Sequence, residues 1–400
     1  MVDFCINGGG MVGAALALGL AQQQFKVVVI EPYLPAPFNA DDGPDLRVSA
    51  ISEASVTLLK ALGAWEHIAA MRVKPYKGLS VWDDPAHRTD FTAQSIDMPQ
   101  LGFFVENRLL QLGCHEALKQ FDNVELISGQ RVTDIQLADT ATVKLSNGRA
   151  VQAKWLIGAD GANSQVRKAA GIGTTGWQYA QQAMGITIEM DKPVEPITWQ
   201  QFTSSGPKAF LPMFDNYASL VWYDSPDELH RIKSLKANQL VNEILNTFPE
   251  ELTQGNNSFS IIDKAVFPLT RSHANHYVKG CCALIGDAAH TINPLAGQGV
   301  NLGFKDIEAF LSVTANFSNA NTNGKQLALI EKAFSQKLIA DYEKPRKRDN
   351  LVMMTAMDGF YTLFSNEVGP IKWIRNQLLS VAQRIEPAKQ EVLKYAIGLR

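Results

Sequence analysis

The sequence predicts an α/β protein in which a Rossmann-like nucleotide-binding domain carries an inserted, mostly antiparallel β lobe and ends in helices. Three observations lead to this prediction. A G-x-G-x-x-G fingerprint follows the first apolar segment, two later strand ends carry an aspartate beside glycine, and short alternating segments fill residues 184–270. Because glycine lets the backbone approach a ligand closely, glycine-rich strand ends indicate a nucleotide site rather than ordinary turns.

Composition and charge exclude several classes of protein. The 400 residues are 46% hydrophobic, which suits two domains or one large domain with an inserted lobe. A formal net charge of −3 leaves no broad basic surface for nucleic acid. The seven histidines show no metal-binding spacing, so we expect no metal. No apolar stretch is long enough to span a bilayer, so any membrane contact should be peripheral.

The cysteines and the N-terminus indicate a reducing compartment. No C-x-x-C pair occurs among Cys5, Cys114, Cys281 and Cys282, and two of these are adjacent in an apolar segment. We therefore expect reduced thiols and a cytoplasmic location. The apolar residues 4–21 lack the basic start of a signal peptide, and their glycines fit a nucleotide fingerprint better.

The chain opens with a βαβ unit. A strand, a helix and a second strand are predicted at residues 2–6, 14–23 and 25–30. The first turn carries the fingerprint glycines, Gly8, Gly10 and Gly13. Glu31 ends the second strand, where a carboxylate can bind the ribose hydroxyls of a dinucleotide. Asn7 is unusual at a position that is normally apolar, and either bonds the turn or costs some stability.

Short elements alternate from there to residue 157. Helices are predicted at residues 53–62, with Gly63 at the end, and at 106–117. Strands are predicted at residues 78–83, 103–105 and 151–157, with two or three more within 124–147. Arg47 precedes the first of these helices and could face a pyrophosphate, although a solvated surface arginine is the alternative. The second helix could meet the cofactor through its N-terminus, or could simply be a capped helix.

The strand at residues 151–157 ends in the run Gly158-Ala159-Asp160-Gly161, which a helix follows. A strand end with a carboxylate beside glycine repeats the pattern of the first turn. This run contains no second G-x-G-x-x-G, so the sequence predicts a single dinucleotide site.

The pattern changes to antiparallel strands in the next part of the chain. They are predicted at residues 184–190, 198–202, 209–213, 218–223 and 260–267, and one helix at 236–248 interrupts them. Aromatic residues are dense here. We expect most of them in the core and about a third against a ligand.

The stretch from Cys281 to Asp306 organises the rest of the chain. An apolar segment at residues 281–285 predicts a buried strand, and Asp287 stands at its end. Pro294 and three glycines then lead to a helix that starts near Asn301. A carboxylate here suits a ribose or ribityl hydroxyl, and the glycine-rich turn lets backbone N–H groups approach a flat, electron-rich ring. A tight strand–helix turn without a ligand is the alternative, and so many small residues make it improbable.

The C-terminal part is predicted to be helical. A loop is expected at residues 318–325 and a helix over 327–363, with a basic patch at 344–348 where Pro345 could cause a kink. Its apolar residues either form an amphipathic surface for lipid or a partner protein, or pack on the first domain, and the second alternative is favoured.

Three motifs in fixed order carry a family resemblance: Gly8-x-Gly10-x-x-Gly13, Gly158-Ala159-Asp160-Gly161 and Gly286-Asp287 with its glycine-rich continuation. Together they resemble the single-component FAD-dependent aromatic hydroxylases of the 4-hydroxybenzoate hydroxylase type. The runs at residues 46–65, 157–172, 286–306 and 349–366 are similar to the ubiquinone-biosynthesis hydroxylases. The runs at residues 40–65, 198–203 and 210–226 look most like the branch that acts on the late demethoxy-quinol intermediate.

The resemblance implies a division of the chain. Residues 1–75, 106–183 and 271–330 would form the FAD-binding domain. Residues 76–105 and 184–270 would form the substrate lobe, and residues 331–400 a helical region.

The resemblance also implies roles for individual residues. Gly8, Gly10 and Gly13 would hold the FAD pyrophosphate, Glu31 the adenosine ribose, and Arg47 and Arg108 the phosphate region. Asp287 would bind the ribityl chain, and Asp160 and Gly161 would serve both FAD and a transient NAD(P)H. The isoalloxazine would be lined by Pro294, Gly297, Gln298, Gly299, Val300 and Asn301.

The implied reaction is hydroxylation of a prenylated benzoquinol ring by O2, through NAD(P)H-reduced flavin and a C4a-hydroperoxide. Because the cofactor supplies this chemistry, no catalytic triad or metal is needed. His290, Tyr217 and Tyr223 are candidates for polarising the ring hydroxyl, and His290 could equally be a structural residue beside the flavin. The alternatives are a sister hydroxylase acting at another ring position, a flavin-dependent isoprenoid reductase, and a non-catalytic FAD-binding scaffold. Other ubiquinone-biosynthesis proteins are candidate partners.

Overall fold

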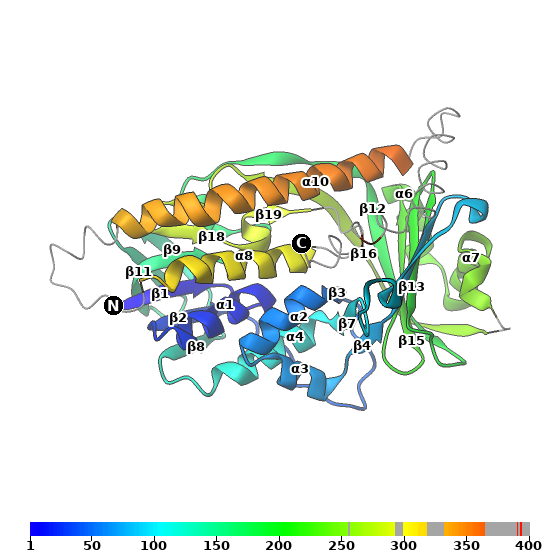
Figure 1. Ribbon diagram of the computed structural model, residues 1–400, viewed down its shortest axis with the longest axis horizontal. Coiled ribbons are helices and arrows are strands. Elements are labelled where there is room, and N and C mark those ends of the chain that lie inside the picture. Colours follow the sequence, from blue (N-terminus) through cyan, green and yellow to red (C-terminus); the bar gives the residue numbers. More distant parts are fainter. Residues whose placement is uncertain (255–256, 293–298, 318–331, 365–389, 391–392, 394–400) are drawn as a thin grey trace.

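The computed structural model describes residues 1–254, 257–292, 299–317, 332–364, 390 and 393, which contain three β-sheets with helices packed on them (Figure 1). The α/β fold class predicted from the sequence is confirmed. The glycine-rich turns and the antiparallel strands lie in two different sheets, and the long C-terminal helix runs along both of them (Figure 1).

The first sheet is the nucleotide-binding sheet. Its strands run in the order β17-β18-β11-β1-β2-β8, and the pairs β18–β11, β11–β1, β1–β2 and β2–β8 are parallel. The bounds are β1 Val2–Asn7, β2 Val27–Glu31, β8 Val124–Ser128, β9 Val132–Leu137, β10 Ala141–Leu145, β11 Ala150–Gly158, β17 Val278–Lys279 and β18 Cys282–Leu284. Strands β9 and β10 extend from β11 as an antiparallel meander. The central strands β1 and β2 and the end of β11 are apolar and mostly buried, as expected for a parallel sheet with helices packed on it, whereas the edge strand β8 is largely half-buried or exposed.

Helices from distant parts of the sequence cover this sheet. Their bounds are α1 Met11–Gln22, α2 Glu53–Ala61, α3 Trp65–Met71, α4 Asn107–Leu118, α5 Gln165–Ala169 and α8 Gly299–Thr314. Helix α1 contacts both α4 and α8, and its many alanines and glycines allow this close approach. The end predicted for the helix at residues 53–62 is confirmed, because Gly63 follows the α2 C-cap with φ of +75°.

The second sheet is the large antiparallel sheet, ordered β19-β16-β12-β15-β14-β13-β5-β6. Its bounds are β5 Gly78–Trp82, β6 Thr89–Thr92, β12 Thr174–Met190, β13 Ile197–Thr203, β14 Gly206–Pro212, β15 Tyr217–Asp224, β16 Phe259–Ala274 and β19 His290–Thr291. Strands β12 and β16 are longer than predicted. Their long pairing joins the lobe to the nucleotide-binding part, since β19 near the Asp287 turn pairs with the end of β16.

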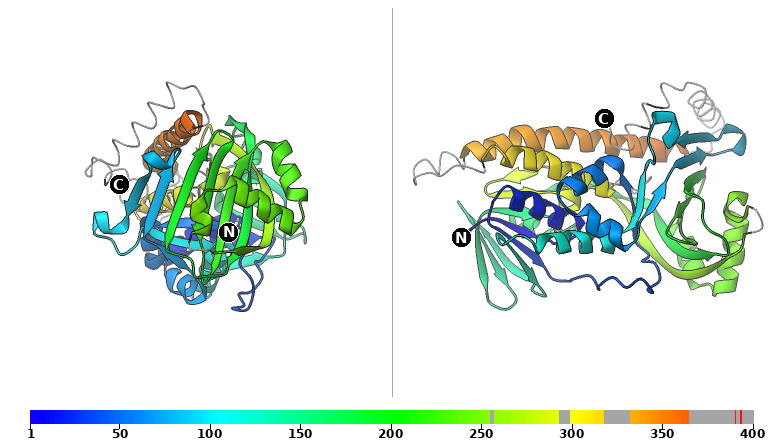
Figure 2. Two further views of the ribbon diagram at one scale, coloured as in Figure 1. Left: turned by 90° about the vertical axis from the view of Figure 1, so that its right-hand side faces the viewer. Right: turned by 60° about the horizontal axis from the view of Figure 1, so that its bottom comes forward.

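Two helices cover the outer face of the large sheet, where the sequence analysis predicted one (Figure 2, left). Helices α6 (Pro226–Ser234) and α7 (Ala237–Thr247) bury Leu229, Ile232, Leu240 and Ile244 against alternate residues of β12 and β15. The missed helix α6 begins with a capping serine, Ser225, which accepts a hydrogen bond from the Glu228 N–H (3.3 Å).

A third, small sheet and several short turns complete the described part of the chain. Strand β7 (Gly102–Glu106) pairs with β3 (Val48–Ser52) and β4 (Lys74–Tyr76), so residues 103–105 belong to this sheet. The short 3₁₀ turns are Pro85–His87, Ala93–Ile96, Glu250–Thr253 and Gly286–Ala288.

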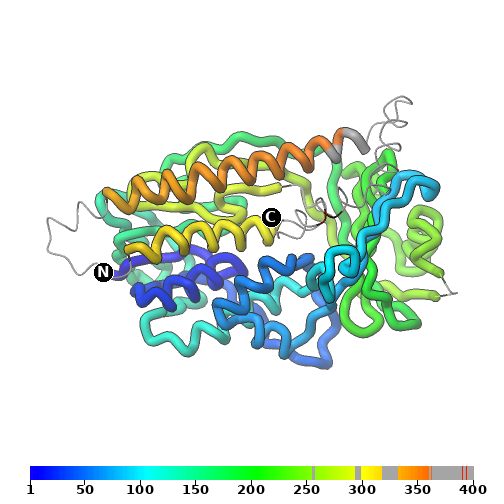
Figure 3. The backbone as a smooth tube through the Cα atoms, viewed as in Figure 1, coloured from blue at the N-terminus to red at the C-terminus, as the bar shows by residue number. Residues whose placement is uncertain are grey.

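The C-terminal helix α10 (Lys344–Phe364) lies beside α8 (Figure 3), and its Asp358 forms an ion pair with Arg271 of the large sheet (2.9 Å). A π-helical turn at Leu338–Glu343 precedes it, directly before Pro345. Proline lacks the N–H that an α-helical turn would use there, so the wider turn accommodates it. The loop predicted at residues 318–325 lies outside the described residues.

All four cysteines are buried, and none of them forms a disulfide in the described part of the chain. Burial raises the pKa of the thiols of Cys5, Cys114 and Cys282 to about 12, so these thiols stay protonated and unreactive.

Candidate functional site

The fingerprint glycines form a turn that depends on close backbone packing. Gly8 has φ of +103°, and a Cβ added there would lie 2.3 Å from the Ala159 carbonyl oxygen. A Cβ on Gly13 would lie 1.9 Å from the Gly8 carbonyl oxygen. A Cβ on Gly10 would meet nothing within 4 Å. Gly8 and Gly13 are therefore required by the fold, whereas Gly10 faces open space where a ligand can approach its backbone.

Glu31 lies beside this turn, at the end of β2. Its Oε2 accepts a hydrogen bond from the Gly9 N–H (2.8 Å), and its Oε1 accepts one from the Tyr33 N–H (3.0 Å). The carboxylate is thus fixed next to the glycine turn, at the position where a ribose hydroxyl of a bound dinucleotide would be.

Helix α4 supports the same turn, which the sequence analysis missed. Gln111 Nε2 donates to the Gly9 carbonyl (3.0 Å). His115 Nε2 lies 2.6 Å from the same oxygen, which can only accept, so this nitrogen carries the proton. Burial lowers the pKa of His115, while the Gly9 carbonyl and Glu31 act in the opposite direction. The residues are 102 and 106 positions from Gly9, and no local pattern marks them.

Asp160 stands at the end of β11 and holds the start of α5. Its Oδ2 accepts hydrogen bonds from Asn7 Nδ2 (2.9 Å) and from the N–H groups of Gln165 (2.7 Å) and Val166 (3.2 Å). The unusual Asn7 therefore bonds the neighbouring turn. Asp160 Oδ1 is buried without a partner among the described residues, and Gly161 next to it, with φ of +76°, faces open space. An orphaned carboxylate oxygen beside an open glycine is suited to a ligand hydroxyl or amide.

The third glycine turn lies against the first. Gly286 packs on Val12 in the first turn of α1, where an added Cβ would be 3.4 Å from Val12 Cγ1. A Cβ on Gly303 of α8 would lie 2.7 Å from Val12 Cγ2. Gly8 already contacts Ala159, so the turns at residues 8–13, 158–161 and 286–287 meet around one helix start. The predicted convergence of the three motifs is present in the structure.

Asp287 presents its carboxylate at this convergence and remains accessible to solvent. The dense protein around it reduces its hydration and so raises its pKa, while the positive charges of His290 and Arg47 act against that rise. The described residues supply no hydrogen-bond donor to the Asp287 carboxylate that would compete with a ligand. This carboxylate is therefore free to accept hydrogen bonds from hydroxyl groups.

The N-terminus of α8 also faces the convergence. The first N–H groups of a helix lack partners within it and favour negative charge. Gly299 begins this helix, and a Cβ there would meet no described atom within 4 Å. Val300 follows and is half-buried. Pro294, Gly297 and Gln298 lie outside the described residues.

Asn301 anchors this helix start. Its Oδ1 accepts hydrogen bonds from the Ser52 N–H (3.0 Å) and Ser55 Oγ (2.9 Å), and its Nδ2 donates to the Ala50 carbonyl (2.8 Å). The side chain, predicted to line the isoalloxazine, is thus occupied by bonds to β3 and α2. Its backbone N–H remains part of the open helix start.

The two arginines predicted for the phosphate region differ in their surroundings. Arg47 is exposed, and its guanidinium lies 5.2 Å from the Phe267 ring of the large sheet. Arg108 is bound to Asp45 (2.8 Å) and to the carbonyls of Ala36 and Pro37 (3.1 and 3.0 Å). Arg108 therefore closes the loop before β3, whereas Arg47 is available to a ligand.

His290 belongs to a buried polar group that we call the Asp306 network, formed by Asp306, His290, Arg346, Asn350 and Tyr277. Asp306 Oδ2 accepts hydrogen bonds from His290 Nε2 (2.5 Å) and from the Gly286 N–H (3.0 Å). Its Oδ1 accepts one from Arg346 Nε (2.8 Å). Arg346 also donates to Asn350, which in turn donates to the Tyr277 hydroxyl.

The Asp306 network fixes the strand end that carries Asp287. Asp306 is fully buried; burial raises its pKa, but the charges and hydrogen bonds of His290 and Arg346 outweigh this and leave the pKa below its ordinary value. The side chain of His290 is 1% exposed and faces Asp306. This arrangement fits the structural role that the sequence analysis gave as the alternative for His290.

Tyr217 and Tyr223 lie on the face of the large sheet opposite α6 and α7. Between them, Leu220 and Trp222 point into the core under those helices, so the odd-numbered residues of β15 face the other way. The two tyrosines are about 20 Å apart along the strand and cannot contact one ring together. Tyr223 packs with Tyr179, Leu269 and Met357, and burial raises its pKa, which disfavours a phenolate there.

The arrangement as a whole fits a flavin dinucleotide. Backbone positions at Gly10, Gly161 and Gly299 face open space, Glu31 and Asp287 offer carboxylates, and Asp160 Oδ1 has no partner among the described residues. A long molecule with ribose hydroxyls in one half and ribityl hydroxyls in the other could use each of these groups.

Comparisons with known proteins agree with this geometry. Residues 1–327 match the family described as FAD binding domain. The chain is 46% identical over 398 residues to a 3-demethoxyubiquinol 3-hydroxylase of Escherichia coli K12, covering 99% of this chain and 98% of that protein. It is 32% identical to a mitochondrial ubiquinone biosynthesis monooxygenase of Xenopus tropicalis, covering 98% and 93%.

Solved structures show the same fold. A p-nitrophenol 4-monooxygenase from Pseudomonas putida superposes with a TM-score of 0.73 at 18% identity, covering 99% of this chain and 98% of that one. A complex of aklavinone-11 hydroxylase with FAD and aklavinone gives a TM-score of 0.67 at 18% identity, covering 98% and 70%.

Proposed function

This chain belongs to the family of FAD-binding hydroxylases of ubiquinone biosynthesis, and from that premise we propose that it adds a hydroxyl group to the ring of a prenylated benzoquinol. It is an FAD-dependent monooxygenase that uses a reduced nicotinamide nucleotide and O2 as co-substrates. The ring position that we propose is the one left unsubstituted in a demethoxyubiquinol, because the E. coli relative is named for that substrate.

The observation that supports the site most strongly is the meeting of three glycine-lined turns at the start of α1, where Ala159 packs on Gly8 and Gly286 packs on Val12. We assign the adenosine half of FAD to Gly8, Gly10, Gly13 and Glu31, and its phosphates to Arg47, with Arg108 closing the loop nearby. The flavin half is assigned to Asp287 and the start of α8, with Pro294, Gly297 and Gln298 completing the turn. Asp160 and Gly161 would serve FAD and the transient NAD(P)H.

FAD, when bound, supplies the activation of O2 that no side chain can provide. The chain binds and orients the ring and keeps water out. The inner face of the large sheet, which carries Tyr223 and Tyr179, closes one side of this space, and buried Leu269 adds an apolar surface. Tyr217 and His290 remain candidates for polarising the ring hydroxyl, and the burial of His290 makes positioning of the Asp287 turn its more direct effect.

Two further features of the chain fit this function. Met357 packs both with the Tyr223 cluster and with Ile292, Leu302, Met353 and Met354, so apolar side chains are continuous from the lobe to α10. We propose that the prenyl tail follows these side chains. The four free cysteines fit the reducing cytoplasm, which we propose as the location. We also retain other ubiquinone-biosynthesis proteins as proposed partners.

The test is single turnover of the purified holoenzyme with a demethoxyubiquinol, NAD(P)H and ¹⁸O2. Mass spectrometry should find one ¹⁸O in the ring of the product, and comparison with regioisomeric standards assigns the position. Incorporation at another position would identify a sister hydroxylase. A product that has gained two hydrogens in its isoprenoid tail but no ¹⁸O, with NAD(P)H consumed, would identify a reductase. FAD binding without turnover would identify a scaffold.

A further inference from the structure

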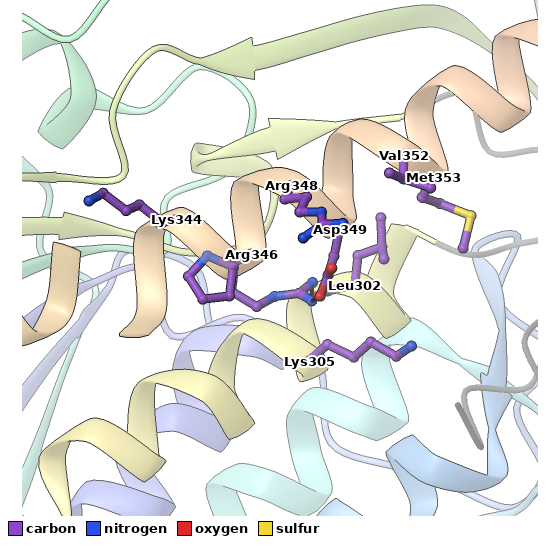
Figure 4. Close-up of a pocket in the computed structure, with 9 residues that line it drawn as sticks. Leu302, Lys305, Lys344, Arg346, Arg348, Asp349, Val352 and Met353 are labelled. Carbon is purple, nitrogen blue, oxygen red and sulfur yellow. Dashed lines mark hydrogen bonds and ion pairs between the residues drawn. The ribbon is translucent and has the colours of Figure 1, made fainter. Parts of the chain in front are cut away.

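A cavity of about 630 Å³ lies between α8 and α10 (Figure 4). We call it the α8–α10 groove. Its lining includes four basic or apolar side chains of α10 and two side chains of α8: Lys344, Arg348, Val352, Met353, Leu302 and Lys305. None of the described residues assigned to FAD lines this groove, so we treat it as a separate site.

The groove has an excess of positive charge. Arg346 also lines it, but this arginine is balanced by Asp306 (2.8 Å) and Asp349 (3.2 Å). Lys305, Lys344 and Arg348 form no ion pair with a residue in the described part of the chain. Burial and then the charge of Arg346 lower the pKa of Lys305, while the carboxylates of Asp349 and Glu308 act in the opposite direction. Three cations of the groove are therefore left without an ion-pair partner among the described residues.

The α10 side of the groove combines cations with exposed apolar side chains. The lining residues Lys344, Arg348 and Val352 follow one another at intervals of four residues and so form one stripe of α10. Leu351 is 47% exposed and Val352 is 54% exposed. Adjacent cations and exposed branched side chains on one helix face are typical of a helix that lies in a lipid interface. Among the described helices, none is both long and apolar enough to cross a bilayer.

We propose that the α8–α10 groove binds the phosphate of an anionic phospholipid headgroup and seats this face of the enzyme on a membrane surface. The three cations are opposite in sign to such a headgroup and can bind its phosphate together. A soluble phosphate would leave Leu351 and Val352 in water, whereas a bilayer interface would cover them. The occupant is therefore a lipid and not a free anion.

The groove also leads toward the substrate lobe. Met353 lines the groove and packs in the cluster with Met357, which contacts the Tyr223 cluster of the large sheet. Seating the groove on a bilayer would place this line of apolar side chains next to the lipid phase. The proposal goes beyond hydroxylation itself, because lipid binding is measurable without substrate, NAD(P)H or turnover.

The test is sedimentation of the full-length holoenzyme with vesicles of phosphatidylcholine alone or with phosphatidylglycerol added. Binding should require phosphatidylglycerol and weaken as salt rises. The triple variant Lys305→Gln, Lys344→Gln, Arg348→Gln should partition less by a factor on the order of one hundred, at about fivefold per cation. The double variant Leu351→Ser, Val352→Ser should also bind more weakly, with an unchanged dependence on salt.

Two controls accompany this test. A variant with the same change in charge elsewhere, Lys119→Gln, Lys144→Gln, Lys233→Gln, and a charge-preserving variant, Lys305→Arg, Lys344→Arg, Arg348→Lys, should both bind vesicles as the native protein does. An unchanged visible flavin spectrum shows that each variant is folded. Equal binding to both kinds of vesicle, or native-like binding by the groove variant, would overturn the proposal. So would binding of inorganic phosphate that depends on the groove without any vesicle binding.

Discussion

At the scale of single residues, Asp306 is the buried carboxylate that connects α8 to its two neighbours. It bonds the strand end through the Gly286 N–H and the ring of His290, and it bonds α10 through the guanidinium of Arg346. A buried carboxylate is stable only when its charge is compensated, and two charged or polar partners compensate it here. Its function is therefore positional: it connects α10 to the turn that presents Asp287.

Replacing Asp306 by Asn should destabilise the protein strongly. The Arg346 side chain, which is 5% exposed, would lose its buried counterion, and a broken buried pair costs about 3–5 kcal/mol. Urea denaturation measures the free energy of unfolding. Asp349→Asn is the matched control, because this carboxylate is 63% exposed and its ion pair with Arg346 should contribute at most about 1 kcal/mol. Equal losses in the two variants would show that the Asp306 network does not stabilise the fold.

His273 predicts a dependence of stability on pH. Its Nε2 bonds the Tyr277 hydroxyl (2.8 Å), and burial, then His290, Lys347 and Arg271, lower its pKa to about 4. At pH values between the ordinary pKa of 6.5 and the lowered pKa of about 4, His273 binds a proton in the unfolded chain but not in the folded chain. The stabilisation is therefore fully present above pH 6.5 and decreases as the pH falls through this window.

The comparison of two variants tests this dependence. His273→Gln should flatten the fall in unfolding free energy between pH 7 and pH 4.5, measured by urea denaturation at each pH. His230→Gln, at an exposed position of α6, should leave the curve of the native protein unchanged. A native-like slope in the His273 variant would assign the pH dependence to other groups.

At the scale of elements, the glycines of the first turn are needed for two different reasons, close packing of the backbone and access for a ligand. Gly13 must lack a side chain because a Cβ there would collide with the Gly8 carbonyl oxygen. Gly10 faces open space, and a side chain there would occupy the room that we assign to the cofactor. We expect Gly13→Ala to destabilise the fold by about 1–3 kcal/mol through overcrowding. Gly10→Ala should fold with native stability without FAD and yet bind FAD at least tenfold more weakly.

Unfolding of the FAD-free protein and quenching of FAD fluorescence on binding measure the two effects separately. Each variant serves as the control for the other. If Gly10→Ala bound FAD as the native protein does, the open space at this turn would not be the cofactor site.

Element boundaries show how much a local pattern can predict. The first strand–turn–helix–strand unit was predicted correctly, because apolar alternation and glycine position are local properties. Helix α6 was missed although Ser225, Pro226 and Glu228 form a recognisable helix start. Strands β12 and β16 exceed their predicted lengths, because pairing between them extends each strand through residues that have no strong alternation of their own.

At the scale of the whole molecule, the cofactor should act as part of the fold. The three turns that meet at the start of α1 come from segments far apart in the chain, so a ligand that contacts all of them favours the folded state. At a free FAD concentration one hundred times its dissociation constant, the free energy of unfolding should rise by about 2.7 kcal/mol. Thermal or urea denaturation with and without FAD measures this.

FMN provides the matched comparison for that experiment. It lacks the adenosine half, which we assign to Glu31 and the glycine turn, so the same concentration of FMN should stabilise the protein less. Stabilisation of equal size by FMN and FAD would mean that the turn at residues 8–13 does not hold the cofactor.

The sequence by itself determined the α/β class and the three glycine-containing motifs, because glycine content, strand ends and apolar alternation are set by neighbouring residues. The single dinucleotide site that these motifs indicate stays a prediction. Only the tertiary structure showed that His115 holds the Gly9 carbonyl, that Asn301 anchors α8 to β3, and that Arg346 compensates Asp306. These contacts join residues 106, 251 and 40 positions apart. Which polar groups meet across such separations depends on how helices pack on the sheets, and packing is a property of the assembled core rather than of any one segment.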